Sequence, residues 1–198
     1  MLHSFVRRGA AVAAAVVLAA IGTSPAQAQD APAVGSMAPE FTGSGVTRYG
    51  PLDAPVSLSD FRGKTVVLAF FPKARTKGCT IQMESYRDKY LELFNGGRDV
   101  VVIGISADPD SALASWAHEA DFPVLFVSDT QGEIGSKYGA WNAAQKYDTR
   151  ALYILAPDGK ITYTTPTFNV LSADSYTELA SEVTKARGTT HGAGHSGH

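Results

Sequence analysis

Three continuous apolar runs separated by helical segments constrain the fold of this chain most strongly. The runs are TVVLAFF (65–71), DVVVIGIS (99–106) and VLFVSD (124–129). Uninterrupted runs rich in β-branched residues are typical of strands that a sheet buries on both faces. Apolar residues recur every three or four positions from Met83 through Leu91 to Phe94, and again at Leu113 and Trp116, so helices are expected between the strands. Strands that alternate with helices predict an α/β fold with a central sheet flanked by helices.

Further segments extend this sheet. VSLSDF (56–61) alternates apolar and polar residues and predicts a half-buried strand. TRALYIL (149–155) and KITYTT (160–165) flank Pro157-Asp158-Gly159, which predicts a closing antiparallel hairpin. The sheet is therefore expected to be mixed. Residues 29–55, rich in Pro, Gly and Ala, are expected to form an arm with at most short strands.

Helix boundaries can also be predicted. Asn95-Gly96-Gly97 should end the first helix. Asp108 and Pro109 predict the start of the next one, with Asp108 as the capping residue. A short helix is expected through Ile134 and Tyr138, and a last helix from about Ser172 to Arg187.

The first residues have the pattern of a secretory signal peptide. Arg7 and Arg8 precede the apolar run AAVAAAVVLAAIGT, and Ala26 and Ala28 supply small residues before a cut. The apolar run is shorter than the roughly 20 residues that a membrane span needs. We therefore expect a signal peptide at 1–28, cleavage after Ala28 and a periplasmic or secreted protein, with the choice between ordinary and twin-arginine export left open.

The rest of the chain is expected to be one domain followed by a tail. Residues 29–187 are enough for a single α/β domain with its own core, and 188–198 form a Gly- and His-rich tail. The chain has 17 Lys and Arg against 19 Asp and Glu, and two of its arginines lie in the expected signal peptide. This mildly acidic balance predicts binding neither to nucleic acid nor, after cleavage, to a membrane.

Cys79, in PKARTKGCT (72–80), is the only cysteine of the chain. Exported proteins usually carry cysteines in pairs, and a single one suggests a free reactive thiol or pairing between molecules. An internal disulfide, a CxxC redox pair and a cysteine-rich zinc site are excluded. A thiol–disulfide oxidoreductase is disfavoured for the same reason.

The position of Cys79 favours reactivity over inert packing, which is the alternative interpretation of a lone cysteine. It follows the strand at 65–71 and falls in the first turn of the next helix, where free N–H groups and the helix dipole favour an anion. Lys73, Arg75 and Lys77 add positive charge in the same loop. The thiolate, which is the nucleophilic form of cysteine, should be stabilised there.

VSLSDFRGKTVVLAFFPKARTKGCT resembles the core of the peroxiredoxins of the AhpC/TSA superfamily, which are thiol peroxidases with a thioredoxin-like fold. Their signature places Pro, three residues, Thr, two residues and Cys in order, as do Pro72, Thr76 and Cys79. VGSMAPEF, FPVLFVSD and TRALYILAPDGKI resemble further family segments, so the likeness covers about 34–186. The TxGCT ending is most similar to the bacterioferritin-comigratory or PrxQ-like branch.

The resemblance implies a role for each matched residue. Cys79 would attack a hydroperoxide, either hydrogen peroxide or an organic one, and become a sulfenic acid. Thr76 would hydrogen-bond the sulfur and the peroxide, and Arg150 would hold the thiolate and the charge on the leaving oxygen. Pro72 would close the pocket over the thiol. No cofactor is implied, and the expected role is antioxidant defence and redox homeostasis.

Two departures from the branch change the expected cycle. Many PrxQ-like proteins have a resolving cysteine five residues after the peroxidatic one, where this chain has Glu84. The cycle is therefore expected to use one cysteine and an external thiol, from a thioredoxin-like or glutaredoxin-like protein or a small thiol. Gln82 stands where the family usually has Glu, and Lys77 replaces a frequent Pro. The protein is expected to be a monomer or a homodimer.

Other residues suggest a second, non-enzymatic hypothesis. His191, His195 and His198 in the tail are weak candidates for binding Cu or Zn, against the ordinary interpretation of a solvated tail. With Cys79 as a further ligand, the same fold would be a binding or metal-handling module. His118, in a predicted helix, is a weak candidate base for Cys79. Trp116 and Trp141 are interpreted as packing residues, and Asp108 and Asp110 as helix caps rather than paired catalytic acids.

Overall fold

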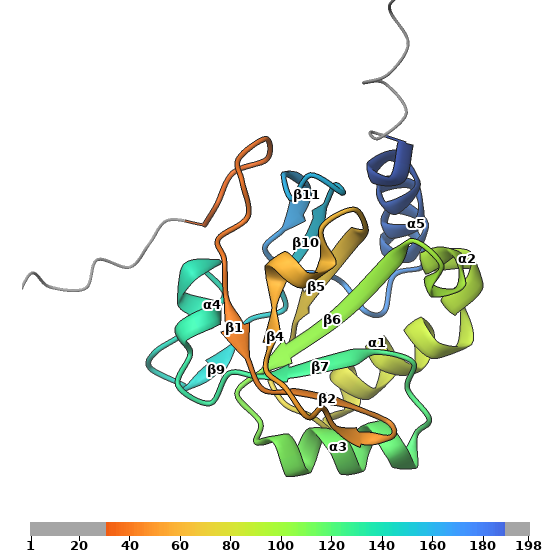
Figure 1. Ribbon diagram of the computed structural model, residues 1–198. Coiled ribbons are helices and arrows are strands. Elements are labelled where there is room, and N and C mark those ends of the chain that lie inside the picture. The colour runs from red at the N-terminus through yellow and green to blue at the C-terminus, as the bar shows by residue number, and fades with distance from the viewer. Residues whose placement is uncertain (1–30, 189–198) are drawn as a thin grey trace, which may run out of the picture.

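A seven-stranded mixed sheet forms the centre of the protein (Figure 1). The computed structural model describes residues 31–188. The strand order across the sheet is β11-β10-β5-β6-β7-β2-β3. Its middle is parallel and consists of β5 (Thr65–Phe70), β6 (Val100–Ser106) and β7 (Leu125–Ser128). The antiparallel flanks are β10 (Leu152–Leu155) and β11 (Ile161–Thr165) on one side and β2 (Gly45–Thr47) and β3 (Gly50–Pro51) on the other.

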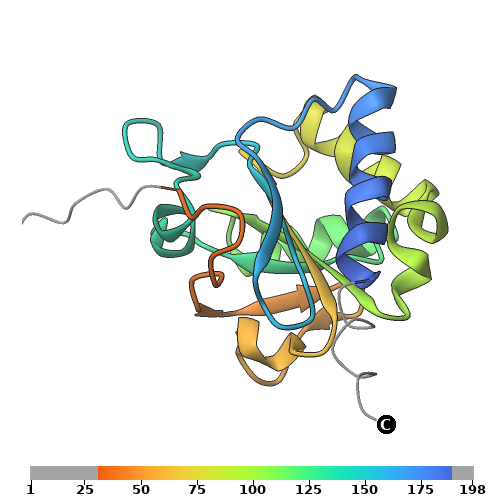
Figure 2. The same ribbon diagram turned by 90° about the horizontal axis from the view of Figure 1, so that it is seen from above.

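Both faces of this sheet are covered, which explains the uninterrupted apolar runs. In β5, Val67 and Ala69 face one core while Leu68 and Phe70 face the other. Four helices pack on the first face: α1 (Lys77–Asp88), α2 (Tyr90–Phe94), α3 (Asp110–Glu119) and α5 (Ala173–Gly188). The second face carries α4 (Glu133–Lys137), a 3₁₀ turn at Leu58–Phe61 and the N-terminal arm. Figure 2 shows the sheet between α5 and the arm.

The strand register brings two distant segments to one edge of the sheet. Phe70, the last residue of β5, pairs with Ile105 near the end of the parallel β6. Because β10 runs antiparallel to β5, its first residue Leu152 pairs with Ala69. The residues just after β5 and just before β10 therefore meet at the carboxyl edge of the parallel strands, where ligands bind in open α/β sheets.

The predicted strand at 56–61 is wrong over most of its length. Only Val56–Ser57 is a strand, β4, and it pairs with β1 (Thr42–Gly43) outside the main sheet. The chain then turns, because the Asp60 carboxylate accepts a hydrogen bond from the Ser57 N–H at 2.8 Å and fixes the start of the 3₁₀ turn. The strand-like alternation came from Val56 and Leu58, which are two residues apart and both buried.

The helix predicted after Cys79 divides in two. α1 ends at Asp88, Lys89 has non-helical dihedral angles (φ −111°, ψ 24°), and α2 follows. The break turns Leu93 and Phe94 into the core. Leu91, which the spacing placed on the inner face, is 71% exposed as a result. Asn95 adopts a left-handed conformation and a 3₁₀ turn at Asn95–Gly97 ends the helical segment, as expected.

Asp108 is not the cap of α3, which is a correction to the sequence prediction. The helix begins at Asp110, and Pro109 is its N-cap residue. The Asp108 carboxylate instead accepts hydrogen bonds from the Ala74 N–H at 2.7 Å and from the Ser106 hydroxyl at 2.9 Å. It therefore ties the loop after β5 to the end of β6.

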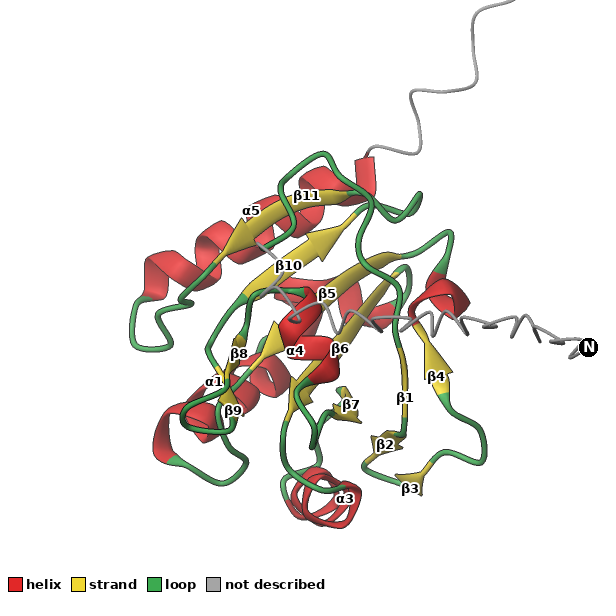
Figure 3. Cartoon of the chain, turned by 90° about the vertical axis from the view of Figure 1, so that its left-hand side faces the viewer, coloured by secondary structure: helices red, strands yellow, loops and turns green. Residues whose placement is uncertain are grey.

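Some local structure carried no clear sequence signal. A small hairpin of β8 (Trp141–Asn142) and β9 (Tyr147–Asp148) stands beside α4 (Figure 3). In the N-terminal arm, β2 joins the main sheet through β7. Within 31–188 no helix combines the length and apolarity that a membrane span requires. The predicted signal peptide at 1–28 and, apart from Gly188, the tail at 188–198 lie outside the described residues.

Gly104 gives a test of this packing. It lies in the middle of β6, where a Cβ atom would come 2.8 Å from the Phe126 ring and 3.3 Å from the Phe71 ring. Gly104→Ala should lower the free energy of unfolding by about 1–3 kcal/mol through overpacking. Urea denaturation measures this change. Gly188→Ala, at the end of α5 with no atom within 4 Å, is the control, and equal stability of the two variants would contradict this account.

Candidate active site

Cys79 lies in the first turn of α1, as the sequence predicted, and is completely buried. Thr76 is the N-cap residue, with extended dihedral angles (φ −77°, ψ 152°), and its carbonyl accepts the Thr80 N–H at 2.9 Å. The sulfur is thus near the positive end of a 12-residue helix. Such a position stabilises negative charge on a thiol.

Arg150 reaches the sulfur from the other segment at this edge. Its Nη2 lies 3.5 Å from Cys79 Sγ, and its Nη1 donates a hydrogen bond to Gln82 Oε1 at 2.7 Å. The backbone of Arg150 is fixed as well, because its carbonyl accepts the Phe168 N–H at 2.8 Å. The family resemblance predicted that Arg150 and the thiol belong to one site, and the structure places them in contact.

Gln82, which the sequence showed only as a departure from the family's usual Glu, is a member of the site. It is buried one turn after Cys79, and its Nε2 donates to the Tyr86 hydroxyl at 3.0 Å. Burial raises the pKa of Tyr86, and the bond from Gln82 opposes this shift, so Tyr86 is a neutral hydroxyl at physiological pH. The amide oxygen of Gln82 therefore orients Arg150 without neutralising its charge. Two sequence signals pointed to this position: its spacing of three residues from Cys79 on one helix and its departure from the family's usual Glu.

Gly78 makes room for the guanidinium group. A Cβ atom at this position would lie 3.1 Å from Arg150 Nη2 and 3.9 Å from the side chain of Val170. The glycine before the cysteine thus allows Arg150 to approach the start of α1 closely. Nothing in the sequence distinguished this role from that of a turn glycine.

Thr76 and Pro72 lie in the same loop before α1, and the Thr76 hydroxyl makes a different contact from the one expected. The exposed Thr76 hydroxyl donates to the Lys73 carbonyl at 2.8 Å, and the structure gives it no bond to Cys79. Pro72 is half-buried, directly after the buried Phe71. The predicted contacts of Thr76 with the sulfur and the peroxide stay predictions.

Arg75, one of the three cationic residues of the loop, forms an ion pair with α3 and not with the thiol. Arg75 has a left-handed backbone (φ 64°) and forms a fork with Glu119 on α3 at 2.7 and 2.8 Å, with a further bond to the Ser115 hydroxyl at 3.1 Å. Arg75 therefore holds the loop to α3 and does not face the thiol, contrary to the sequence interpretation. Lys73 and Lys77 are exposed.

His118 does not serve as a base for Cys79 in this structure. It is exposed on α3, and its Nδ1 contacts the Arg48 carbonyl at 3.1 Å. Trp116 is buried in the core, as the packing interpretation held. Asp110 accepts a hydrogen bond from the Ser44 hydroxyl at 2.6 Å and lies in the first turn of α3.

The described part of the chain holds no cluster of metal-binding side chains beside the thiol. Residues 31–188 contain no group of three His, Cys, Asp or Glu side chains close enough to hold a metal ion. The tail candidates His191, His195 and His198 lie outside this range. A groove of about 360 Å³, lined partly by Tyr49, Tyr90 and Phe122, includes none of the predicted site residues.

Solved structures share this fold. A crystal structure of AhpC from Enterococcus faecalis has a TM-score of 0.69 and 17% sequence identity, covering 83% of this chain and 98% of that one. A crystal structure of peroxidoxin BcpB from Mycobacterium tuberculosis has a TM-score of 0.65 and 24% identity, with coverages of 78% and 97%. The expected thioredoxin-like fold with a central mixed sheet is thereby confirmed.

Sequence comparison identifies the family. The chain is 39% identical over 108 residues to a putative peroxiredoxin bcp of Haemophilus influenzae, covering 54% of this chain and 65% of that protein. It is 35% identical over 112 residues to peroxiredoxin Bcp of Escherichia coli, covering 54% and 70%. For the Haemophilus protein, and for a relative from Buchnera aphidicola matched over 56% of its length, the match spans less than two thirds. Residues 34–164 match the model of the AhpC/TSA family. This chain therefore belongs to the AhpC/TSA family.

Proposed function

We propose that this protein is a thiol-dependent peroxidase that uses a single cysteine to reduce hydrogen peroxide and organic hydroperoxides. The observation that carries the proposal is the contact of the Arg150 guanidinium with Cys79 Sγ, held in place by Gln82. A cation fixed against a buried thiol at a helix N-terminus stabilises the thiolate and the charge that develops during its attack. The relatives named peroxiredoxin support the same reaction.

In the first step the Cys79 thiolate attacks the terminal oxygen of the hydroperoxide. A sulfur–oxygen bond forms while the oxygen–oxygen bond breaks, and the sulfur is oxidised by two electrons to a sulfenic acid. The leaving oxygen takes up a proton and departs as water or alcohol. Arg150 stabilises the charge on this oxygen, and the Thr76 hydroxyl turns from the Lys73 carbonyl to the peroxide. Pro72 shields the sulfur from bulk water.

Reduction of the sulfenic acid then requires an external thiol. Cys79 is the only cysteine of the chain, so no second sulfur can resolve it internally. One external thiol attacks the sulfenic sulfur and releases water, and a second thiol frees Cys79 as a disulfide forms between the two. A thioredoxin-like protein or a small thiol fits this role. Because Cys79 is fully buried, such a thiol reaches it only when the first turn of α1 opens.

The first experiment follows the thiol of Cys79 after addition of hydrogen peroxide to the purified, reduced protein. Stopped-flow measurement with trapping of the sulfenic acid should give an oxidation rate orders of magnitude above that of free cysteine, because the thiolate is stabilised and the leaving oxygen is held. Cys79→Ser should abolish peroxide reduction. Oxidation no faster than that of free cysteine would contradict the proposal and favour a binding module.

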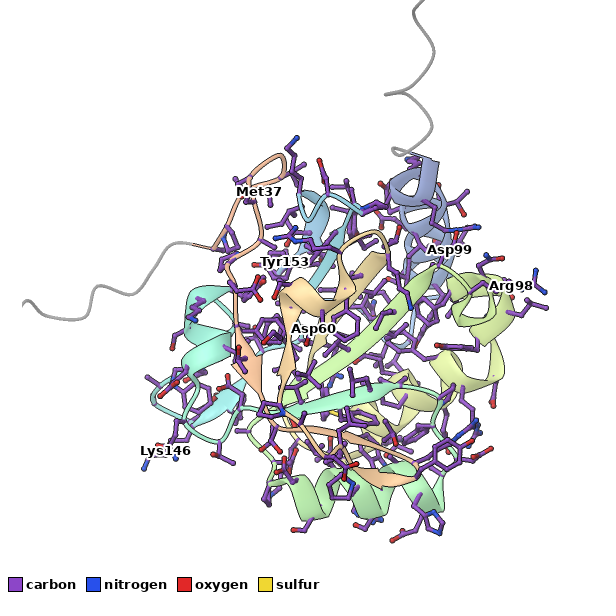
Figure 4. The ribbon with its side chains drawn as sticks, in the orientation of Figure 1. Met37, Asp60, Arg98, Asp99, Lys146 and Tyr153 are labelled. Atoms are coloured by element: carbon purple, nitrogen blue, oxygen red, sulfur yellow. The ribbon has the colours of Figure 1, made fainter. Side chains whose placement is uncertain are left out.

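A second pair of variants tests the bridge between Arg150 and Gln82. Arg150→Met should slow oxidation of Cys79 by more than about tenfold, since it removes the cation at the sulfur. Gln82→Leu should cause a smaller loss because Arg150 keeps its charge but loses its anchor, whereas Gln82→Glu keeps an acceptor and should lose least. Arg98→Met is the matched control, because Arg98 is exposed at the surface (Figure 4) and precedes β6, at the opposite end of the parallel strands from Cys79. Near-normal rates for Arg150→Met would rule out this arrangement.

We further propose that the protein is exported and acts in the periplasm or outside the cell. Support comes from the charged, apolar and small-residue order of residues 1–28. Expression of the full chain in a bacterial host should yield a periplasmic product whose mass corresponds to a start at Gln29. A product that keeps Met1 and stays in the cytoplasm would contradict export and leave the reaction chemistry unaffected.

A further inference from the structure

The carboxyl group of Asp148 is buried without a hydrogen-bond partner. Asp148 is the last residue of β9 and is 0% exposed. Neither of its oxygens receives a hydrogen bond within the described structure. An unpaired carboxylate in such a place is strongly unfavourable, whereas a neutral carboxylic acid costs far less. The native fold therefore favours the uncharged form of this side chain.

The surroundings of Asp148 strengthen this preference. Its Oδ1 lies against Gly135 in α4, where even a single Cβ atom would collide with it. Asp129, which follows β7, uses its carboxylate to accept the N–H groups of Ile134 at 3.1 Å and Gly135 at 2.7 Å. Burial first, and the charge of Asp129 second, raise the pKa of Asp148 to about 8. Glu133, at the start of α4, raises the pKa of Asp129 in turn, but less than burial does.

Asp148 is linked to the candidate active site through the backbone. Its strand partner is Trp141 in β8, and the Thr149 N–H that follows donates to the Ala140 carbonyl at 2.7 Å. Arg150 comes next, two residues after Asp148. The other hairpin residues are half-buried or exposed, and Lys146 at the tip points away from the body of the protein (Figure 4). Asp148 is thus its most deeply buried side chain, and it lies next to Arg150 in the chain.

We propose that Asp148 is a positioning residue for Arg150: as a neutral acid it docks the hairpin 141–148 on α4, and its ionisation loosens the hairpin and withdraws the guanidinium from Cys79. The proposal rests on the proposed peroxidase function. It has an unusual consequence, because thiols ordinarily react faster as pH rises and their thiolate fraction grows. Here oxidation of Cys79 should become slower as the pH rises through about 8.

Asp148→Asn tests the proposal, since asparagine has nearly the same shape and cannot ionise. The rate of Cys79 oxidation by hydrogen peroxide is measured from pH 6 to 9.5. The wild-type rate should fall several-fold above pH 8, while the variant's rate should stay level or rise. Asp158→Asn is the matched control, because Asp158 is exposed in a turn, and it should keep the wild-type profile. Profiles that fall equally in the wild type and in Asp148→Asn would overturn the proposal.

Two readouts do not depend on peroxide chemistry. Amide hydrogen exchange over 140–149, corrected for intrinsic pH effects, should accelerate above pH 8 in the wild type and not in the variant. The second readout is the free energy of unfolding. The pKa of Asp148 in the folded protein is raised above its unfolded value of about 3.9. The contribution of Asp148 to stability is therefore complete below about pH 3.9 and is lost as the pH rises toward 8. Asp148→Asn should therefore gain stability relative to the wild type between pH 5 and 8 in urea denaturation.

These readouts separate the two proposals. Slow oxidation at every pH, with the expected exchange and stability differences, would contradict the peroxidase function and uphold the control of the hairpin by Asp148. Fast oxidation with identical exchange in both proteins would uphold the peroxidase and overturn the role of Asp148. If Asp148→Asn folds poorly by circular dichroism, Asp148→Ala serves instead, and a fall of its rate above pH 8 equal to that of the wild type would overturn the proposal.

Discussion

The contact between Arg150 and Cys79 is the interaction on which the rest of this structure depends. A guanidinium group carries its charge at any physiological pH and presents several donors in a rigid plane. It can therefore hold the sulfur with one nitrogen and the Gln82 amide with another. Each part of the surroundings serves this geometry: Gly78 leaves space beside it, and Tyr86 receives the other end of the Gln82 amide.

The sheet makes that contact achievable between residues 71 positions apart. Cys79 follows the carboxyl end of β5, in the first turn of α1. Because β10 runs antiparallel to β5, the first residue of β10 lies beside the carboxyl end of β5. The loop that carries the thiol is then held from two sides, by Asp108 at the end of β6 and by Glu119 on α3. A site built from two strand ends and two side-chain anchors needs little flexibility to keep its shape, which suits preorganised electrostatic catalysis.

Much of the fold could be predicted from the sequence because the buried strands are apolar on both faces. Few architectures besides a sheet covered by helices accommodate such runs in alternation with helical spacing. Two of the wrong predictions have local causes. The Asp60 carboxylate bonds the Ser57 N–H and ends β4 early, and the break in the helix at Lys89 leaves Leu91 exposed. In the site, Cys79 stood out as the only thiol, and Arg150 required the family resemblance. Gln82, Asp108 and Glu119 act through tertiary contacts, which a linear sequence does not display.

The complete burial of Cys79 has a consequence for the balance between repair and damage. A hydroperoxide is much smaller than a protein thiol, so the opening that admits it to the buried sulfur is smaller than the one that a thiol reductant requires. Once the sulfenic acid has formed, a second peroxide and the thiol reductant compete to react with it, and the smaller peroxide has easier access. How often the first turn of α1 opens, and not how strongly the reductant binds, would then set the share of molecules lost to irreversible oxidation. The two hydrogen bonds between Arg75 and Glu119, which hold the loop to α3, would slow the opening of the first turn of α1.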